Sequence, residues 1–145
     1  MGLPLFDDAM WFIHELEQQS AGQTLSRLID EAPEEDEDRR LMKDELTLLN
    51  RLLAPEDRLA EYVDLFPLFG VTHGNCGLLI AAPTSTILIA GDAVPTQDHF
   101  LTGQVLPDAS DIHTAQESLR EVYEIADQVV PGHDNIFINP RTHGM

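Results

Sequence analysis

The chain has 145 residues, of which 43% are hydrophobic, and 26 acidic against 8 basic residues give a formal net charge of −18. This length and hydrophobic content predict a single folded domain over residues 1–145 and exclude a disordered tail. The acidic balance argues against binding to nucleic acid or to an anionic membrane, and no apolar run approaches the roughly 20 residues that span a bilayer.

The first 40 residues contain one apolar run and one acidic segment. Met10–Ile13 could be a short buried strand or the start of a helix, because periodicity does not separate the two. Residues 31–38 are almost all acidic and include a proline, which predicts a solvated loop. Cation binding is the functional alternative for this acidic loop.

The middle of the chain alternates between helical and extended patterns. Leucines at helical spacing predict a helix from about Asp38 to Ala54, ended by Pro55. Tyr62–Phe69 predicts a strand, which Pro67 restricts to an edge or an end of a sheet.

The second half predicts two strands, a helix and a further strand. Leu78–Ala82 and Thr86–Ala90 are β-prone runs joined by a turn, which indicates a hairpin. Thr114 with Glu117 forms a capping-box pattern before an apolar helical stripe. The apolar pair that begins at Val129 predicts a short buried strand.

Three polar residues follow apolar runs directly: His73, Asp92 and His133. A residue just past a buried strand is held at the rim of a sheet, where rigidly positioned binding groups concentrate. Two imidazoles and a carboxylate suit zinc, or another first-row metal such as iron or manganese. A glycine beside each residue lets the backbone turn sharply. Taken singly, each of the three could equally be an ordinary turn or surface residue.

Together these segments resemble the metallo-β-lactamase-fold metallohydrolases. Leu88-Ile-Ala-Gly-Asp-Ala93 is similar to the strand that ends in Gly-Asp in that family, and Val129-Val-Pro-Gly-His133 to its closing Pro-Gly-His. Phe69-Gly-Val-Thr-His73 is similar to its Pro-Gly-His-Thr turn, with Val71-Thr72 in place of Pro-Gly. The three residues lie 19 and 41 positions apart, in the family's order. The resemblance covers residues 58–138 well and 1–57 loosely.

The resemblance implies an α/β fold, one half of an αββα sandwich with a mixed sheet flanked by helices. It implies that His73 binds a first metal, that His133 binds a second, and that Asp92 bridges the two and takes part in catalysis. Zinc is the expected cofactor, with one or two ions in the complete site and iron or manganese as alternatives. In the family these metals activate a hydroxide that attacks an ester, lactone, thioester or similar bond of a small-molecule substrate.

The family's His-x-His-x-Asp-His segment, which supplies four ligands, is absent, because the only histidine before His73 is His14. Three of seven ligand positions therefore remain, and we expect the chain by itself to be inactive. Two alternatives stay open. The chain could be a non-catalytic remnant that acts as an interaction or scaffold domain, or it could hold one metal with two histidines and a carboxylate.

The remaining histidines and the one cysteine have weaker interpretations. His99 lies in the long loop after Asp92, where family members often place substrate contacts. His14, His113 and His143 are expected to be solvated or capping residues. Cys76 could be a soft metal ligand, but a small apolar role is favoured over that.

A single cysteine excludes an internal disulfide, and the N-terminus has no basic segment of a secretory signal, so we expect a cytoplasmic protein. Only one of the basic residues is a lysine, which suggests a salt-rich cytoplasm or simply an acidic surface. Half of a sandwich leaves one apolar sheet face uncovered. We therefore expect either a homodimer or a complementing N-terminal half.

Overall fold

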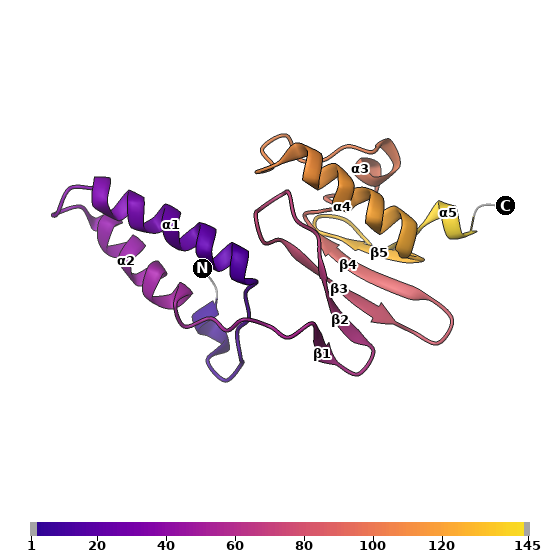
Figure 1. Cartoon of the computed structure of the whole chain (residues 1–145), viewed down its shortest axis with the longest axis horizontal. Coiled ribbons are helices and arrows are strands. Elements are labelled where there is room, and N and C mark those ends of the chain that lie inside the picture. Colours follow the sequence, from indigo (N-terminus) through magenta and orange to yellow (C-terminus); the bar gives the residue numbers. More distant parts are fainter. Residues whose placement is uncertain (1–2, 144–145) are drawn as a thin grey trace. The chain divides into compact units, whose positions relative to one another are not determined.

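The computed structural model of the chain describes residues 3–143, which divide into two compact units on either side of the Pro55–Glu56 bond. The first unit is helical and the second contains a sheet with helices (Figure 1). The sequence predicts one partial domain over residues 1–145. Whether both units belong to one domain stays a prediction.

The first unit is a pair of helices preceded by a short 3-10 turn, η1 (Leu3–Phe6). Helix α1 (Glu15–Glu31) packs against α2 (Glu37–Leu49), and among the described residues of this unit only Ile29, Leu49 and Leu52 are buried hydrophobic residues. Such a small apolar core provides little of the burial that stabilises a fold.

Several boundaries in the first unit differ from the sequence prediction. The acidic loop is shorter than 31–38, because its first residue ends α1 and its last two begin α2. The predicted helix over 38–54 begins one residue earlier and ends at Leu49. The apolar run Met10–Ile13 is neither a helix start nor a full strand, since Phe12 makes one isolated parallel bridge with Leu53.

The second unit is built on a six-stranded mixed sheet in which neighbours in space are neighbours in sequence. Its strands are β1 (Arg58–Ala60), β2 (Val63–Pro67), β3 (Cys76–Ala81), β4 (Thr86–Gly91), β5 (Gln128–Pro131) and β6 (Phe137–Ile138). Only β4 and β5 are parallel, and every other pair is antiparallel. The predicted hairpin is therefore confirmed as β3 and β4, and the predicted α/β class with a mixed sheet is confirmed as well.

One face of this sheet carries the hydrophobic core. Helices α3 (Gln97–Thr102) and α4 (Ile112–Ile125) lie over it (Figure 1). The core joins Phe100 of α3 and Val122 of α4 to Leu88 of β4 and Val129 of β5, and the last three of these are fully buried. The chain from β4 to β5 passes through α4, as a parallel pair requires a crossover connection.

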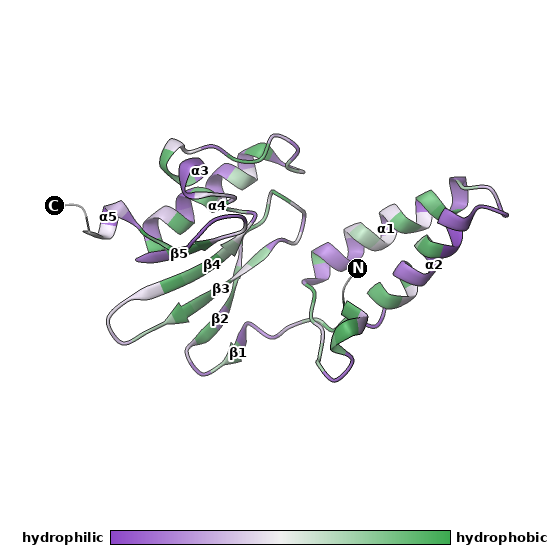
Figure 2. Ribbon diagram, turned by 180° about the vertical axis from the view of Figure 1, so that it is seen from behind, coloured by the Kyte–Doolittle hydropathy of each residue, from purple (hydrophilic) through white to green (hydrophobic). Residues whose placement is uncertain are grey.

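The opposite face of the sheet is apolar but is not buried. Residues that pair across antiparallel strands, and every second residue along a strand, point to the same face. The register therefore places eight aliphatic residues opposite α4, a set that we call the open face: Val63, Leu65, Leu78, Ile80, Ile87, Ile89, Val130 and Ile138. None of the eight is among the buried core residues, and Ile138 is 57% exposed. Figure 2 shows the same strands β2, β3 and β4 in the hydrophobic colour.

Helix α4 begins differently from the capping-box prediction. Its N-cap is Asp111, whose carboxylate accepts a hydrogen bond from the Thr114 backbone N–H, so Thr114 lies inside the first turn. This bond is the main reason that the pKa of Asp111 lies below its ordinary value. Aspartate and threonine are both good N-cap residues, so spacing alone does not distinguish a helix capped by Asp111 from one capped by Thr114.

The C-terminal end of α4 is capped by residues that follow β6. The fully buried Asn139 side chain donates to the backbone carbonyls of Tyr123 and Ala126, each at 2.8 Å. Its side-chain oxygen accepts from the backbone N–H of Arg141, in the short helix α5 (Pro140–His143). These bonds tie the last turn of α4 to the segment beyond β6.

Candidate metal centre

The three predicted ligands lie at one end of the sheet. His73 lies in the turn between β2 and β3, Asp92 directly follows β4, and His133 follows β5. Because β2 ends where β3 begins, and because β4 and β5 are parallel with Gly91 opposite Pro131, all three segments leave the sheet at the same end. The strand pairing thus brings together residues up to 60 positions apart.

Two of the three side chains are in contact. The Nε2 atom of His133 lies 3.0 Å from Oδ1 of Asp92, and the side chains are 69% and 48% exposed. An exposed pair of this kind contributes little to stability, because solvent screens the charges. Its value lies in the placement of one imidazole and one carboxylate side by side, each of which can bind a metal.

Glycines make this contact sterically possible. Gly91 has a φ of +53°, a conformation that side chains rarely adopt, and it turns the chain out of β4 just before Asp92. A Cβ on Gly132 would lie 2.4 Å from the Asp92 carboxylate, so no larger residue fits there without moving that group. The sharp turn at Gly91 agrees with the sequence prediction, and the close approach at Gly132 adds to it.

Backbone and side-chain bonds hold the loop of His133 against the loop that follows Asp92. The N–H of Gly132 donates to the carbonyl of Val94, and the N–H of His133 donates to the carbonyl of Pro95. One residue further on, the Asp134 carboxylate accepts from the backbone N–H of Gln97 at 3.2 Å. Asp134 was not predicted from the sequence as a residue of this site. Its place directly after the Pro-Gly-His segment is the feature that could have indicated it.

His99, the predicted substrate contact, lies in α3 and is partly buried. Its Nδ1 atom lies 2.8 Å from the hydroxyl of Thr96, the N-cap of the same helix. The ring is therefore engaged in the first turn of α3. A contact of His99 with substrate stays a prediction.

Asp92, His133 and His73 do not form a group of three side chains that could hold a metal. Within residues 3–143, the part of the chain that the structure describes, no three His, Cys, Asp or Glu side chains are grouped so that they could hold a metal. The turn that precedes His73 is tied to the start of α4, since the N–H groups of Ser110 and Asp111 donate to Val71 and Gly70. Cys76, at the start of β3, has its sulfur 3.3 Å from the Gly74 carbonyl.

The other histidines match the expectation of capping or solvated residues where the structure describes them. The His14 side chain caps α1 by accepting from the N–H of Leu16, and His113 is exposed with Nδ1 3.7 Å from Glu117. The side chain of His143 lies outside the described residues.

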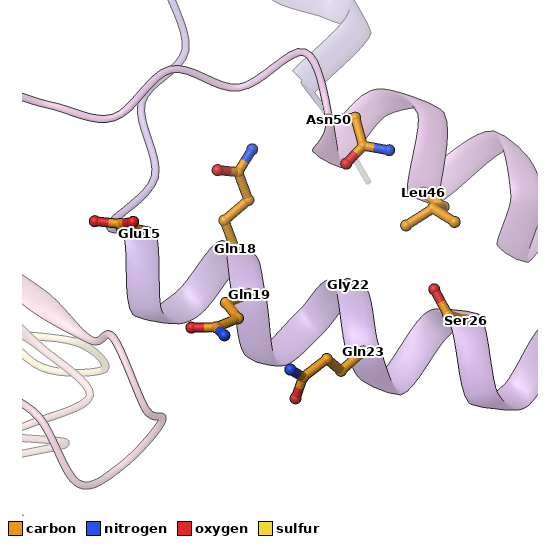
Figure 3. Close-up of a pocket in the computed structure, with 8 residues that line it drawn as sticks. All are labelled: Glu15, Gln18, Gln19, Gly22, Gln23, Ser26, Leu46 and Asn50. Atoms are coloured by element: carbon orange, nitrogen blue, oxygen red, sulfur yellow. The ribbon is translucent and has the colours of Figure 1, made fainter.

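The first unit contains a hollow of about 700 Å³ between α1 and α2. Figure 3 shows glutamines, among them Gln18, Gln19 and Gln23, on the α1 side of this hollow and Asn50 across from them. Its lining includes no histidine and only one carboxylate, that of Glu15. This hollow therefore lacks the ligands and paired ionisable groups on which metal or acid–base chemistry depends.

The chain matches no known family profile and no curated protein, but it resembles several solved structures. One is AiiA of B. thuringiensis with N-decanoyl-L-homoserine bound at its active site, at 21% identity and a TM-score of 0.57. Another is AidC, a dizinc quorum-quenching lactonase, at 12% identity and a TM-score of 0.62. A third is a candidate metallo-β-lactamase of Thermotoga maritima, at 16% identity and a TM-score of 0.58.

The fold is one half of the metallo-β-lactamase fold. The matches cover 85%, 88% and 92% of this chain but only 46%, 49% and 60% of AiiA, AidC and the Thermotoga protein. The chain thus spans about half the length of the structures it matches. At these identities the likeness establishes the fold, and the predicted half of a metallo-β-lactamase-like sandwich is confirmed. Among residues 3–143, no helix is both long and apolar enough to cross a membrane.

Proposed function

We propose that this chain is the second half of a metal-dependent hydrolase that acts on an ester, lactone, thioester or similar bond. The observation that supports the proposal is the 3.0 Å contact between Asp92 and His133, two residues 41 positions apart. They follow the two parallel strands of a metallo-β-lactamase half-fold, and polar groups that rigid strands position at one end of a sheet are typical of a binding site.

The described residues do not form a complete zinc site. Structural zinc sites have four protein ligands and catalytic sites normally have three, whereas Asp92 and His133 are two. The turn of His73 lies at the same end of the sheet, and His73 is the third proposed ligand. We propose that the remaining ligands come from a complementing half that carries a His-x-His-x-Asp-His segment.

The substrate of the complete protein is proposed to be a small molecule. Of the matched structures, AiiA has N-decanoyl-L-homoserine bound at its active site and AidC is a lactonase, so lactones are the first class to test. The net charge of −18 disfavours polyanionic substrates such as nucleic acids.

A non-catalytic scaffold is the second candidate function. It is favoured by one observation, that no three metal-binding side chains are grouped within residues 3–143. A scaffold would keep the sheet and the core but would have no need for the contact between Asp92 and His133. The two proposals therefore differ in what removal of that contact does to metal binding.

Zinc titration of the purified chain against a chromophoric competitor tests the hydrolase proposal. We expect weak binding of about one zinc ion per chain, since two ligands hold zinc less tightly than three or four. Asp92→Ala and His133→Ala should each weaken binding at least about tenfold, because loss even of residues that only support ligands costs 10- to 100-fold. His113→Ala is the matched control, since it removes an exposed imidazole that is not a proposed ligand.

Equal zinc affinity in the unchanged chain, in Asp92→Ala and in His133→Ala would contradict the proposal and favour the scaffold.

A panel of lactones, esters and thioesters tests whether the chain by itself is catalytic. The isolated chain with zinc should hydrolyse none of them above background, because its ligand set is incomplete. Turnover that persists in Asp92→Ala would also contradict the proposed site.

A further inference from the structure

Asp134 is an exposed aspartate that directly follows His133 in the loop between β5 and β6. Both oxygens of its carboxylate accept hydrogen bonds from backbone N–H groups, one from Gln97 at 3.2 Å and the other from Asn135 at 2.8 Å. In the part of the chain that the structure describes, Asp134 forms no metal-binding group of three with Asp92 and His133. Its carboxylate is therefore directed to the backbone, as in residues that hold metal ligands in place and do not bind the metal themselves.

The bond from Gln97 joins two segments that are far apart in the sequence. Gln97 begins α3, five positions after Asp92, whereas Asp134 is one position after His133. Two backbone bonds, donated by Gly132 and by His133, join the same two segments. Of these three bonds, the one to Asp134 is the only one that lies beyond His133 in the chain. Without it, His133 would be fixed at its own backbone N–H and before it, but not after it.

Helix α3 is a firm support for this bond, because its Phe100 is buried in the core of the second unit. The centre of the Phe100 ring lies 5.1 Å from that of Phe137 in β6 and 5.6 Å from that of Tyr123 in α4. Close packing of this kind fixes the helix relative to the sheet. Since Phe137 also follows the loop of Asp134 in the chain, the same cluster anchors the far end of that loop.

We propose that Asp134 is a positioning residue, which holds the His133 imidazole beside the Asp92 carboxylate through its bond with the Gln97 N–H. The inference rests on the proposed function for its metal, but the positioning itself is a property of the chain without metal. Ordering a mobile loop costs conformational entropy when a ligand binds, and a loop that is ordered beforehand avoids part of this cost. The bond should therefore raise metal affinity. Because it is exposed, it should add little to the stability of the whole unit.

Gln97 allows this bond to be removed without a change of charge. It is the first residue of α3, where proline is well tolerated because the N–H of that position has no partner within the helix. The preceding Thr96 is extended, with φ −144° and ψ 167°, close to the conformation that a residue before proline favours. Gln97→Pro thus removes the donor and keeps the Asp134 carboxylate, and Gln97→Ala is the matched control that keeps the N–H. Asp134→Asn removes the charge but keeps an oxygen acceptor, whereas Asp134→Ala removes both.

NMR spectroscopy of the full chain without metal tests the positioning directly. The backbone order parameters of residues 133 and 134 should be about 0.85 in the unchanged chain, in Gln97→Ala and in Asp134→Asn. They should fall toward about 0.6 in Gln97→Pro and in Asp134→Ala. The imidazole nitrogen shifts of His133, measured where the ring is neutral, should respond to Asp92→Asn in the unchanged chain and should no longer respond when Gln97→Pro is also present. The urea midpoint of unfolding should be the same in all these variants.

Zinc titration connects the positioning to the proposed site. Gln97→Pro and Asp134→Ala should each lower zinc affinity by about threefold to tenfold, which is the net effect of one hydrogen bond and less than the loss of a ligand. Gln97→Ala and Asp134→Asn should stay within about twofold of the unchanged chain, since both keep the bond and solvent screens the lost charge of an exposed residue. The double variant Gln97→Pro with Asp134→Ala should bind no more weakly than either single variant, because both changes remove the same bond.

Two outcomes would overturn the positioning role of Asp134. The first is that Gln97→Pro and Gln97→Ala have the same order parameters and the same His133 shifts. The second is that Asp134→Asn binds zinc as weakly as Asp134→Ala, because the charge and not the bond would then matter. Loss of order in Gln97→Pro, in a chain that binds no zinc, would support the positioning of His133 but would overturn the metal site. The positioning role and the proposed hydrolase can therefore fail separately.

Discussion

Replacement of Asn139 by alanine should destabilise the second unit strongly. Asn139 is fully buried, and its side chain makes three hydrogen bonds: two to the carbonyls of Tyr123 and Ala126 and one from the N–H of Arg141. Each bond contributes about 1 kcal/mol, and the carbonyls that alanine leaves without this partner are costly to bury. We therefore expect Asn139→Ala to lower the free energy of unfolding by about 3 kcal/mol.

Urea denaturation followed by far-UV circular dichroism measures this loss, with hydrogen exchange of the β4 and β5 amides to assign it to the second unit. A loss of about 3 kcal/mol corresponds to a melting temperature lower by roughly 15 °C for a unit of this size. Asn135→Ala is the control, since Asn135 is exposed in the neighbouring loop and its replacement should change stability by less than about 0.5 kcal/mol.

A loss of less than about 1 kcal/mol in Asn139→Ala, at an unchanged dependence on urea, would refute this reasoning. It would mean that water forms hydrogen bonds with the carbonyls at the end of α4 as well as Asn139 does. Asn139→Asp separates the two halves of the argument, because it keeps the acceptor for Arg141 but replaces the donor to Tyr123 and Ala126. We expect this variant to be as unstable as the alanine variant at neutral pH.

Two further predictions concern the start of α4. Gly70 and Gly103 both have positive φ, but a Cβ on Gly70 would lie 2.1 Å from the Ala115 backbone nitrogen, whereas a Cβ on Gly103 meets nothing within 4 Å. Gly103→Ala should therefore lower the urea-derived stability by about 1 kcal/mol, and Gly70→Ala should give little folded protein; similar effects would contradict the packing. The lowered pKa of Asp111, caused mainly by the bond from the Thr114 N–H, favours the ionised carboxylate in the folded state. Its stabilising effect is thus present above the ordinary carboxyl pKa of about 3.9 and is lost as the pH falls through the lower folded value. The gap in melting temperature between the unchanged chain and Asp111→Ala should close on acidification, and a gap that stays constant would exclude this linkage.

Asp92 and His133 alone do not form a complete metal site. Asp92 and His133 are held in contact by a parallel strand pair and by the bond between Asp134 and Gln97, which is a substantial scaffold for two exposed side chains. Metal binding by this pair stays a proposal. The zinc titration tests it directly.

Local patterns in the sequence were sufficient for the central elements of the second unit. The hairpin of β3 and β4 and the strand β5 follow from short β-prone runs, and the helix α4 follows from its apolar stripe. The same patterns failed for α1, whose glutamine-rich turns carry a weak apolar stripe and whose cap is His14, an uncommon capping residue. They also misplaced the cap of α4, because Asp111 and Thr114 are both good capping residues three positions apart.

The sequence by itself determined which residues stand at the ends of strands, because a buried strand followed by Gly-Asp or Pro-Gly-His is a local pattern. The contact of Asp92 with His133 depends in addition on the parallel pairing of β4 with β5. Only the tertiary structure decided that His73 does not complete a group of three metal-binding side chains with that pair, and that the turn before it is hydrogen-bonded to the start of α4. Likewise, only strand pairing decides which aliphatic residues share the open face, because a shift of one residue in register would move each of them to the other side of the sheet.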